Sequence, residues 1–526
     1  MTDSSIEAGT TSERISGEFM VKFALLHLRL RWLTVGICLA MMLVPLLRAL
    51  AGADAQQSTV ITSVTEGRSI AMTSDWNASP HPNAAGIPAV TIDAEVSVPD
   101  AQPGAPHITG KMRIEQLPPL ALAEERLPLR LYPNAQQYGD ASMTVSEVQV
   151  DGQLVDTTAE MDDTILWIPL ESRSKVVELT FQAQIGPLST ASFGIFSATP
   201  DGTAMLLGHW YPMLVPIQAD GWFLDPIAEI GDPIFAPYAD YQVSVGAPIG
   251  MTVVATGVRL TTDPIANVAT FATGPVREVV LAVSSSWVPT SVSVGETTVT
   301  AWAPMGLPDG GMGVADAAVA ALTIFEGMFG PYPYRELDIV AYNLNGASGM
   351  EFPGVIVLSP EYWQAPLSSF AESVIAHEIA HQWWYGLVAN NQYVSPVLDE
   401  GLAQRAGTEL YFEARYGSGR GDEMYESQAG RMFDEEGGLA GMLSPALPAD
   451  AYPDMRSYFV SVYAGGGEAF HVLREQIGDD AFATGLKQIL ADHAFSTVSP
   501  DDYRSAWESA CACELATFWE TWFPNP

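Results

Sequence analysis

Residues Ile375 to Trp384 read IAHEIAHQWW, the most informative segment of the chain. It holds two histidines, His377 and His381, four residues apart, with Glu378 directly after the first. Residues four apart lie on one face of an α-helix, one turn from each other, so the two imidazoles can share one metal ion. This HExxH pattern predicts a helix that carries a metal site, and the structural alternative is a buried helix whose histidines only satisfy hydrogen bonds.

A third ligand is available in Glu400. Between His381 and Glu400 lie 18 residues (400 − 381 − 1), enough for the end of one helix, a loop and the start of an antiparallel helix. A catalytic zinc takes three protein ligands and leaves its fourth position open. The pattern therefore predicts one Zn²⁺ ion on His377, His381 and Glu400, since two imidazoles and a carboxylate favour zinc over cobalt or manganese. The alternative for Glu400 is a carboxylate stabilised at a helix start, and Asp399 is interpreted as a cap.

Glu378 lies on a different part of the helix surface from His377, within reach of a water molecule on the ion. Zinc lowers the pKa of such a water to about 7, and a nearby carboxylate can move its proton to a leaving amine. These residues predict amide hydrolysis without a covalent intermediate.

The composition excludes some other classes of protein. The 526 residues include 23 Lys and Arg against 62 Asp and Glu, a formal net charge of −39 that argues against nucleic-acid binding. Residues 1–55 hold five of each kind, so the acidity belongs to the rest of the chain. A hydrophobic content of 48% is ample for more than one core, and the length predicts about two to four domains.

Residues 1–55 form a predicted leader with an export signal or membrane anchor. An uncharged, mostly apolar run extends from Trp32 to Leu47, with basic residues before it and Arg48 after it. At about 1.5 Å per residue its 16 residues (47 − 32 + 1) are shorter than a comfortable membrane span, yet the leader is long for a cleaved signal. Cleavage and anchorage stay equally open. In both cases the basic residues predict that the rest of the chain lies outside the cytoplasm.

The remaining chain divides by texture into three parts. Residues 56–88 are predicted to be a solvated spacer, because they show no apolar period. Residues 89–303 contain short alternating stretches between turn signals, which predict an antiparallel β domain. Residues 304–526 predict a mixed α and β domain. The expected strands include 108–114, 143–150, 164–168, 176–185, 241–245, 276–283, 291–301, 337–342 and 355–359, and the expected helices 312–329, 368–387, 398–416, 465–477, 481–493 and 501–510.

From about Phe329 onward the chain resembles the catalytic domain of the aminopeptidase N family of zinc metallopeptidases, the gluzincins that include leukotriene A hydrolase. Weaker likeness extends into the β-rich half. The segments that carry the resemblance are FGPYPY at 329–334, GMEFPG at 349–354, the HExxH helix with Glu400, YAGG at 463–466 before FHVLR at 470–474, LYPN at 131–134 and WYP at 210–212.

The resemblance implies a thermolysin-like fold for residues 304–526 and a substrate with a free amino terminus. Glu351 matches the glutamate that grips the substrate's α-amino group in the family, next to Gly349 and Met350 of the substrate-binding strand. Tyr463 matches the tyrosine that stabilises the oxyanion, with Tyr458 as its competitor. A solvated carboxylate and a core tyrosine are the structural alternatives.

The chain departs from the family pattern in three places. Phe352 stands where the family has Asn, which puts one polar contact to the substrate or its supporting residues in doubt. The β-rich half shows no convincing counterpart of the second acidic residue that binds the amine in many relatives. The chain also ends near the close of the catalytic domain, which predicts no C-terminal helical repeat domain, and hence a more open cleft or one that a partner covers.

The sequence thus predicts a metalloaminopeptidase acting on peptides, and two alternatives stay open. One is an endopeptidase or another zinc hydrolase with an open cleft, and the other is an inactive metal-containing binding module. Cys511 and Cys513 are predicted to be two buried thiols more readily than a disulfide, because residues two apart have poor geometry for a bridge.

Overall fold

The computed structural model describes residues 63–98, 105–188, 191–232, 234–417 and 419–524. The chain divides into two compact units, Met1–Thr59 and Val60–Pro526, and all described residues belong to the second. The predicted leader, with its apolar run 32–47, lies outside the described residues.

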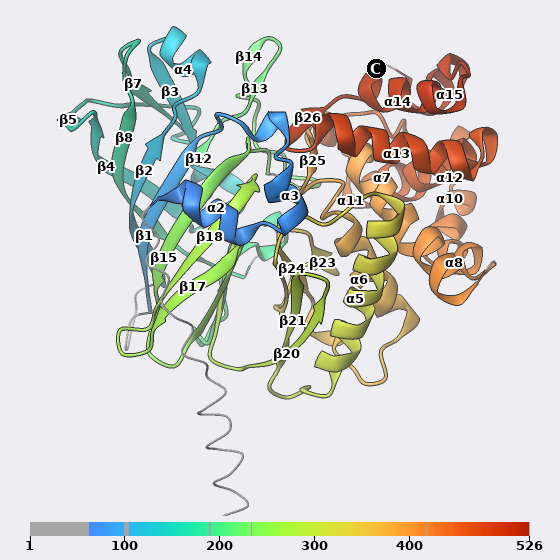
Figure 1. Ribbon diagram of the computed structural model, residues 1–526, viewed down its shortest axis with the longest axis horizontal. Helices are drawn as coiled ribbons and strands as arrows, with labels where there is room; N and C mark the ends of the chain where they lie inside the picture. Colours follow the sequence, from blue (N-terminus) through green and yellow to red (C-terminus); the bar gives the residue numbers. More distant parts are fainter. Residues whose placement is uncertain (1–62, 99–104, 189–190, 233, 418, 525–526) are drawn as a thin grey trace, which may run out of the picture. The chain divides into compact units, whose positions relative to one another are not determined.

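The first half of the unit is built on an eight-stranded sheet in the order β17-β18-β15-β1-β2-β8-β4-β5 (Figure 1). In β2 and β8 buried residues alternate with more exposed ones, as expected where one face of a sheet covers a core. The neighbours run antiparallel except β1, which pairs with β15 in parallel, so the sheet is mixed rather than purely antiparallel as predicted. The strands are β1 (Ala89–Ser97), β2 (His107–Glu115), β4 (Ser142–Val150), β5 (Gln153–Leu154), β8 (Val176–Gln184), β15 (Ala239–Gly246), β17 (Val258–Asp263) and β18 (Val268–Val276).

Three smaller sheets complete the β-rich part. Their orders are β16-β19-β11-β10-β9, β12-β3-β7-β6 and β13-β14. The strands are β3 (Arg126–Arg130), β6 (Thr158–Glu160), β7 (Ile165–Pro169), β9 (Gly186–Pro187), β10 (Phe196–Ala198), β11 (Ala204–Leu207), β12 (Met213–Leu214), β13 (Ile217–Gln218), β14 (Gly221–Trp222), β16 (Thr252–Ala255) and β19 (Leu281–Ser284).

The segment predicted to be a solvated spacer is packed against the fold from residue 63 onward. It forms α2 (Val64–Ala71), α3 (Ser74–Ala78) and the turn η1 (Pro82–Ala84). Arg68 of α2 pairs with Asp240 of β15 at 3.3 Å, and Gly67 lies so close to the sheet that a Cβ atom would be 2.7 Å from Ala272. From residue 63 onward the segment differs from a solvated spacer because α2 buries Val64, Gly67 and Ala71, a short helical period inside a polar stretch.

The second half begins at a five-stranded sheet in the order β20-β21-β22-β24-β23. The strands are β20 (Trp287–Val294), β21 (Thr297–Pro304), β22 (Glu336–Ala341), β23 (Gly349–Met350) and β24 (Val355–Leu358). Residues 291–301, predicted as one strand, instead form a hairpin that turns at Gly295. Because β21 pairs in parallel with β22, residues 287–304 belong to the same sheet as the strands of the second half.

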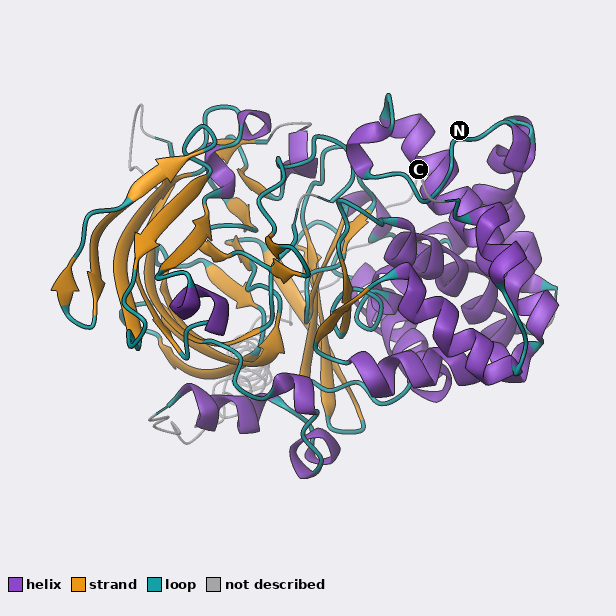
Figure 2. Ribbon diagram, turned by 90° about the horizontal axis from the view of Figure 1, so that it is seen from above, coloured by secondary structure: helices purple, strands orange, loops and turns teal. Residues whose placement is uncertain are grey.

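Helices dominate the rest of the chain, so strands and helices segregate in space (Figure 2). The main ones are α5 (Gly310–Met328), α6 (Ser369–Ala380), α7 (Val397–Arg405), α8 (Tyr411–Tyr416), α9 (Arg420–Tyr425), α10 (Arg431–Glu435), α11 (Met455–Tyr458), α12 (Gly466–Ile477), α13 (Asp479–His493), α14 (Pro500–Cys511) and α15 (Ala516–Trp522). Three π-helical turns, η6 (Ala406–Leu410), η7 (Glu426–Gly430) and η10 (Phe459–Gly465), interrupt them.

The predicted helix 368–387 ends early. The α6 helix stops at Ala380, with His381 as its C-cap, and tight turns follow up to the short strand β25 (Val388–Asn390). Tyr385 in these turns has φ 147°, which no α-helix accommodates. The sequence 381–387 is apolar enough to read as helix, but its backbone departs from one.

The α5 helix is the one helix in the described residues that is long and apolar enough to cross a membrane. It packs on β20, β21 and α6, and Val314, Leu322 and Phe325 are buried in the core. Its composition therefore fits a core helix.

Cys511 and Cys513 are joined in a disulfide at the end of α14. The prediction of two free thiols was wrong. Ala512 between them adopts a left-handed conformation, with φ 51°, which turns the chain back at the helix end and brings the two sulfurs together.

Candidate metal centre and substrate cleft

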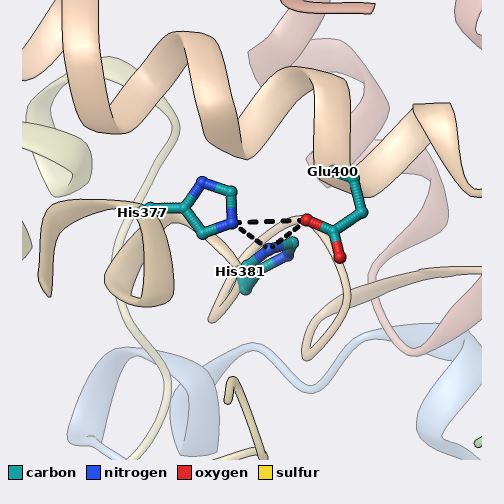
Figure 3. Close-up of side chains that lie close together, drawn as sticks. All are labelled: His377, His381 and Glu400. Atoms are coloured by element: carbon teal, nitrogen blue, oxygen red, sulfur yellow. Dashed lines mark hydrogen bonds and ion pairs between the residues drawn. The ribbon is translucent and has the colours of Figure 1, made fainter. Parts of the chain in front are cut away.

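His377 and His381 project from the end of α6 toward Glu400 in the first turn of α7 (Figure 3). The two Nε2 atoms lie 3.0 Å apart, and each is 3.3 Å from Oε2 of Glu400. The helix start is fixed by Ser368, whose side chain accepts a hydrogen bond from the Ala371 amide. The three predicted metal ligands thus converge on one point.

The donor atoms are oriented by their other contacts. Nδ1 of His381 lies 3.0 Å from the Trp384 carbonyl, so it is the protonated nitrogen and Nε2 carries the free lone pair. Oε1 of Glu400 accepts a hydrogen bond from the Tyr463 hydroxyl at 2.5 Å. Its buried Oε2 atom has no hydrogen-bond partner among the described residues. Three lone pairs therefore face one point without a donor between them.

This set of donors fits zinc. Two imidazole nitrogens and one carboxylate oxygen are the ligands of catalytic zinc sites, which keep a fourth position open. Burial opposes ionisation of Glu400, but the two imidazoles hold its pKa well below the usual range. The carboxylate is therefore charged and ready for a cation.

Glu378 is buried beside the metal site and lines the adjacent cleft. Its carboxylate lies over Gly349 of β23, where a Cβ atom would be 2.2 Å from Oε1. Burial and the neighbouring Glu351 raise the pKa of Glu378 well above its usual range. A raised pKa suits a group that has to take up and release a proton.

Glu351 follows β23 and is 4% exposed. Gln392 donates to its Oε1 atom at 3.4 Å. Sequence reasoning found no second acidic residue here, but the structure brings Asp232 of the β-rich part to the same place. One oxygen each of Asp232, Glu351 and Glu400 lies within 4.8 Å of the others, and all three residues are buried. Burial and the other two carboxylates raise the pKa of Asp232.

Asp232 was missed because nothing near it in the chain marks a site. It sits in a loop after Gly231, which has φ 74°, and only the tertiary fold carries this loop to the cleft. The one sign of Asp232 in the sequence was a single carboxylate ahead of the apolar residues Ile234 to Ala236, and this pattern does not indicate a site.

Tyr463, in the π-helical turn η10, lines the cleft and stacks on His377, with ring centroids 5.9 Å apart. Its competitor Tyr458 does not line it. The Tyr458 hydroxyl lies against Gly231, where a Cβ atom would be 2.6 Å away. The geometry favours Tyr463 as the hydroxyl that faces a substrate.

The cleft has a volume of about 220 Å³. Gly349 and Met350 of the edge strand β23 form one wall. The titratable groups among its described lining residues are four carboxylates, the His377 imidazole and the Tyr463 hydroxyl, with no lysine or arginine. Other lining residues are apolar or neutral: Phe193, Phe370, Val374, Gln404, Gln428, Met455 and Phe459.

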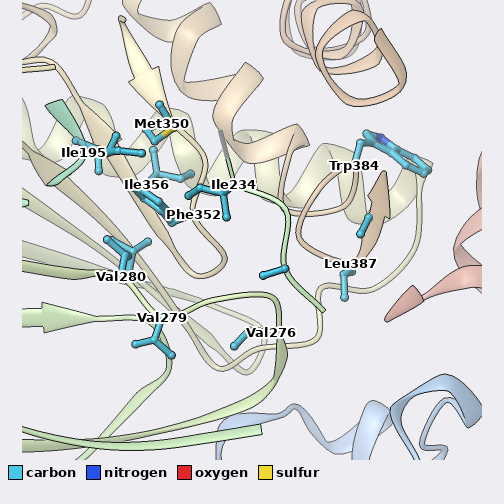
Figure 4. Packing of buried hydrophobic residues seen from close by; sticks show 14 of the residues in the cluster. Ile195, Ile234, Val276, Val279, Val280, Met350, Phe352, Ile356, Trp384 and Leu387 are labelled. Carbon is cyan, nitrogen blue, oxygen red and sulfur yellow. The ribbon is translucent and has the colours of Figure 1, made fainter. Parts of the chain in front are cut away.

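Phe352 takes no part in this lining. It is 1% exposed and packs toward the β-rich part, where a Cβ on Gly208 would be 3.2 Å from its ring. Figure 4 shows it among buried hydrophobic residues that include Ile195, Ile234 and Val280. The residue that replaces the family Asn therefore joins the two halves instead of binding substrate.

An HExxH helix supplies two histidines, and a downstream glutamate joins them. A β-rich half precedes the helical half that holds this site. These features together define the class of zinc metallopeptidase folds. Residues 314–522 match the Peptidase family M1 domain. This match lies in the second half of the chain, and the resemblance of this part to the aminopeptidase N family is confirmed.

Curated relatives match over about two fifths of the chain. Aminopeptidase N of Lactococcus lactis subsp. lactis is 27% identical over 221 residues, which cover 40% of this chain and 26% of the relative. Human endoplasmic reticulum aminopeptidase 1 is 28% identical over 207 residues, which cover 37% and 22%. The matched part thus spans about a quarter of these relatives' length.

Solved structures match over more of the chain. The M1 zinc metallopeptidase from Deinococcus radiodurans covers 84% of this chain and 94% of its own, with a TM-score of 0.61 and 19% identity. A glutamate-to-alanine mutant of the same protein, bound to a Tyr-Ser-Ala substrate, gives a TM-score of 0.59 at 19% identity. At these identities the likeness shows the fold, with its β-rich first part and helical second part.

Proposed function

We propose that this protein is a zinc-dependent aminopeptidase that removes amino-terminal residues from peptides. The observation that carries the proposal is the pair of buried carboxylates, Glu351 and Asp232, beside the ligand set of His377, His381 and Glu400. An ammonium group complements these carboxylates only when the peptide's first residue lies at the metal site. The two curated relatives named above are both called aminopeptidases, which supports the proposed activity.

His377, His381 and Glu400 would hold one Zn²⁺ ion, which would supply Lewis-acid chemistry and lower the pKa of water to about 7. Glu378 then accepts a proton from the attacking water and delivers it to the nitrogen of the leaving amine as the carbon–nitrogen bond breaks. The hydroxyl of Tyr463 donates to the carbonyl oxygen as negative charge develops on it. The products are a free amino acid and a peptide shortened by one residue.

The substrate's orientation follows from the walls of the cleft. The edge strand β23 offers backbone groups at Gly349 and Met350 to an extended peptide. Glu351 and Asp232 bind the ammonium at one end of this wall. We infer a thermolysin-like arrangement of sheet and zinc helices in the second half.

We also propose that the protein acts outside the cytoplasm, cleaved from its leader or anchored through residues 32–47. The basic residues ahead of this apolar run support that orientation.

The proposal is tested with the full-length protein on a panel of aminoacyl fluorogenic amides and their N-acetylated counterparts. We expect turnover of the free amines only, loss of turnover after chelation, and recovery with added zinc. Glu378→Gln removes the proton carrier without changing side-chain size, and it should lower kcat by at least about 100-fold. Turnover of acetylated peptides would indicate an endopeptidase, and a folded, zinc-loaded protein without turnover would indicate a binding module.

A further inference from the structure

Tyr385 has a backbone conformation that side-chain-bearing residues rarely adopt, with φ 147°. Such conformations cost about 1–3 kcal/mol and persist only where the surroundings enforce them. Tyr385 directly follows Trp384, whose carbonyl oxygen lies 3.0 Å from Nδ1 of His381. The unusual backbone is therefore one residue from the atom that orients a metal ligand.

The side chain of Tyr385 is held by two residues of the β-rich part. Its hydroxyl donates to Oε1 of Glu278 at 2.6 Å. The guanidinium of Arg277 lies over the ring, 4.2 Å from its centroid, and Nη1 donates to the Tyr385 carbonyl at 3.5 Å. All three residues are at most 2% exposed. Residues of the β-rich half thus contact both the hydroxyl and the carbonyl group of Tyr385.

Arg277 also contacts the loop that carries Asp232. Its Nη2 atom donates to the Ile234 carbonyl at 3.4 Å. One guanidinium therefore bridges the turn after α6 and the loop that reaches the cleft. Val276 and Val279, which flank Arg277 and Glu278, belong to the same hydrophobic cluster as Trp384 and Leu387 of the turn (Figure 4).

Stability alone is a poor reason for this arrangement. Arg277 and Glu278 are both buried, and burying polar or charged side chains costs desolvation free energy that apolar side chains of the same volume avoid. Nε of Arg277 and Oε2 of Glu278 have no hydrogen-bond partner among the described residues. The pair is incompletely satisfied and yet holds a strained residue beside the metal ligands.

We propose that Tyr385, clamped by Arg277 and Glu278, is a positioning residue that fixes the Trp384 carbonyl on His381 and thereby sets the affinity for zinc. The carbonyl accepts the Nδ1 proton, which keeps the Nε2 lone pair directed at the metal site. Partners that orient metal ligands in this way typically contribute about 10–100-fold to metal affinity. The inference rests on the proposed function only in requiring that the site binds zinc.

The test compares the zinc dissociation constants of wild-type and Tyr385→Phe full-length protein, measured by competition with a chromophoric chelator. The variant removes the hydroxyl that Glu278 binds and keeps the ring under Arg277. We expect about 10-fold weaker binding or more, and a changed visible absorption spectrum of the cobalt-substituted protein.

Tyr342→Phe is the matched control. Its buried hydroxyl also joins the two halves, donating to the Ser197 carbonyl at 3.1 Å, but it does not touch the metal site. This variant should keep the wild-type zinc affinity. The Tm of both zinc-free variants reports any loss of stability that is independent of metal.

Equal zinc affinity of wild-type and Tyr385→Phe would overturn the inference, whatever the loss in Tm. If Tyr385→Phe does not fold, Arg277→Lys replaces it, since it retains the charge but loses the planar stacking and the fork that reaches two carbonyls. It should also weaken zinc binding, and unchanged affinity would again overturn the inference. A wild-type protein that binds no zinc would instead contradict the proposed function.

Discussion

A single residue, Gly349, leaves the space that the Glu378 carboxylate occupies. A Cβ atom there would lie 2.2 Å from Oε1 of Glu378, so Gly349→Ala must displace this buried carboxylate. We expect kcat to fall by about 10-fold or more, because general acid–base catalysis typically contributes 100- to 10,000-fold and depends on hydrogen-bonding distance. Zinc binding should stay near the wild-type level, since the metal ligands are not touched.

Gly327→Ala is the control for this prediction. Gly327 lies in α5, and a Cβ atom at this position meets nothing within 4 Å. The substitution should keep full activity and stabilise the protein by up to about 1 kcal/mol, the usual preference for Ala over Gly in a helix. Full activity of Gly349→Ala would show that Glu378 reaches the substrate from another position.

The β-rich half is expected to contribute directly to substrate binding through Asp232. Asp232→Asn keeps the shape but removes the charge, and a hydrogen bond to a charged group contributes about 1.5–3 kcal/mol. We therefore expect KM for aminoacyl amides to rise by about 10-fold or more, with a smaller change in kcat. Steady-state kinetics at several substrate concentrations separates the two.

Asp225→Asn provides the matched control, because Asp225 is exposed on a nearby loop and does not line the cleft. It should leave KM unchanged. An unchanged KM in Asp232→Asn would assign the ammonium to Glu351 alone.

The residues of the site differ in how well the sequence predicts them. His377, Glu378 and His381 follow from helical spacing, and Glu400 from one helix-loop-helix interval. Glu351 and Tyr463 needed the family resemblance, because single residues on a strand or helix carry no spacing signal. Asp232 could not be predicted, since only the packing of the two halves brings it to the cleft.

At the scale of elements, Phe352 shows how a strand end joins the two halves. The residue is 1% exposed, and its ring packs on Gly208 within the hydrophobic core cluster that contains residues of both halves. Phe352→Ala should cost about 3–5 kcal/mol, the usual loss for a buried aromatic ring. Denaturant unfolding of the zinc-free protein measures this loss. A change below 1 kcal/mol would mean that the halves do not depend on this contact.

Element boundaries were harder to predict than element types. The expected strands 108–114, 143–150, 176–185 and 241–245 match β2, β4, β8 and β15, and the helices α5, α12, α13 and α14 also lie where they were expected. The expected strand 276–283 was wrong, because it covers the end of β18 and the start of β19. The pairing of β21 with β22 joins residues that are far apart in the chain, so no local pattern could predict it. The helix 368–387 was predicted too long because backbone departures such as φ 147° at Tyr385 leave the apolar pattern unchanged.

At the scale of the whole molecule, buried carboxyl groups make stability depend on pH. Burial raises the pKa of Glu278 to about 7 from an ordinary 4.5, although Arg277 opposes the shift. Between these values the folded state binds a proton that the unfolded state has lost, so stability falls as the pH rises. From pH 5 to 8 this group should cost the wild type about 2–3 kcal/mol relative to Glu278→Gln.

Denaturant unfolding of zinc-free wild type and Glu278→Gln at both pH values measures the difference. The comparison cancels the other titrating groups, because both proteins carry them. A constant difference across this range would mean that Glu278 ionises in the folded protein as it does in water.

The net charge of −39 predicts that added salt stabilises the folded protein. A protein held together by ion pairs would instead be destabilised by salt. Four lysines, Lys22, Lys111, Lys175 and Lys487, are all the chain has, so most carboxylates lack a basic partner. Repulsion between them destabilises the compact state, and salt screens it over about 10 Å at 0.1 M. We expect the Tm to rise by a few degrees between 10 and 500 mM NaCl, measured by calorimetry.

Sucrose at matched osmolality separates screening from a general solute effect and should raise the Tm less. The described ion pairs pull the other way: Arg474, for example, lies 3.1 Å from both Glu409 and Glu413, and salt weakens such contacts. A falling Tm would mean that these pairs outweigh the repulsion. Because unpaired carboxylates greatly outnumber the basic residues, the repulsive term should dominate, and the same acidic surface should favour positively charged peptide substrates at low salt.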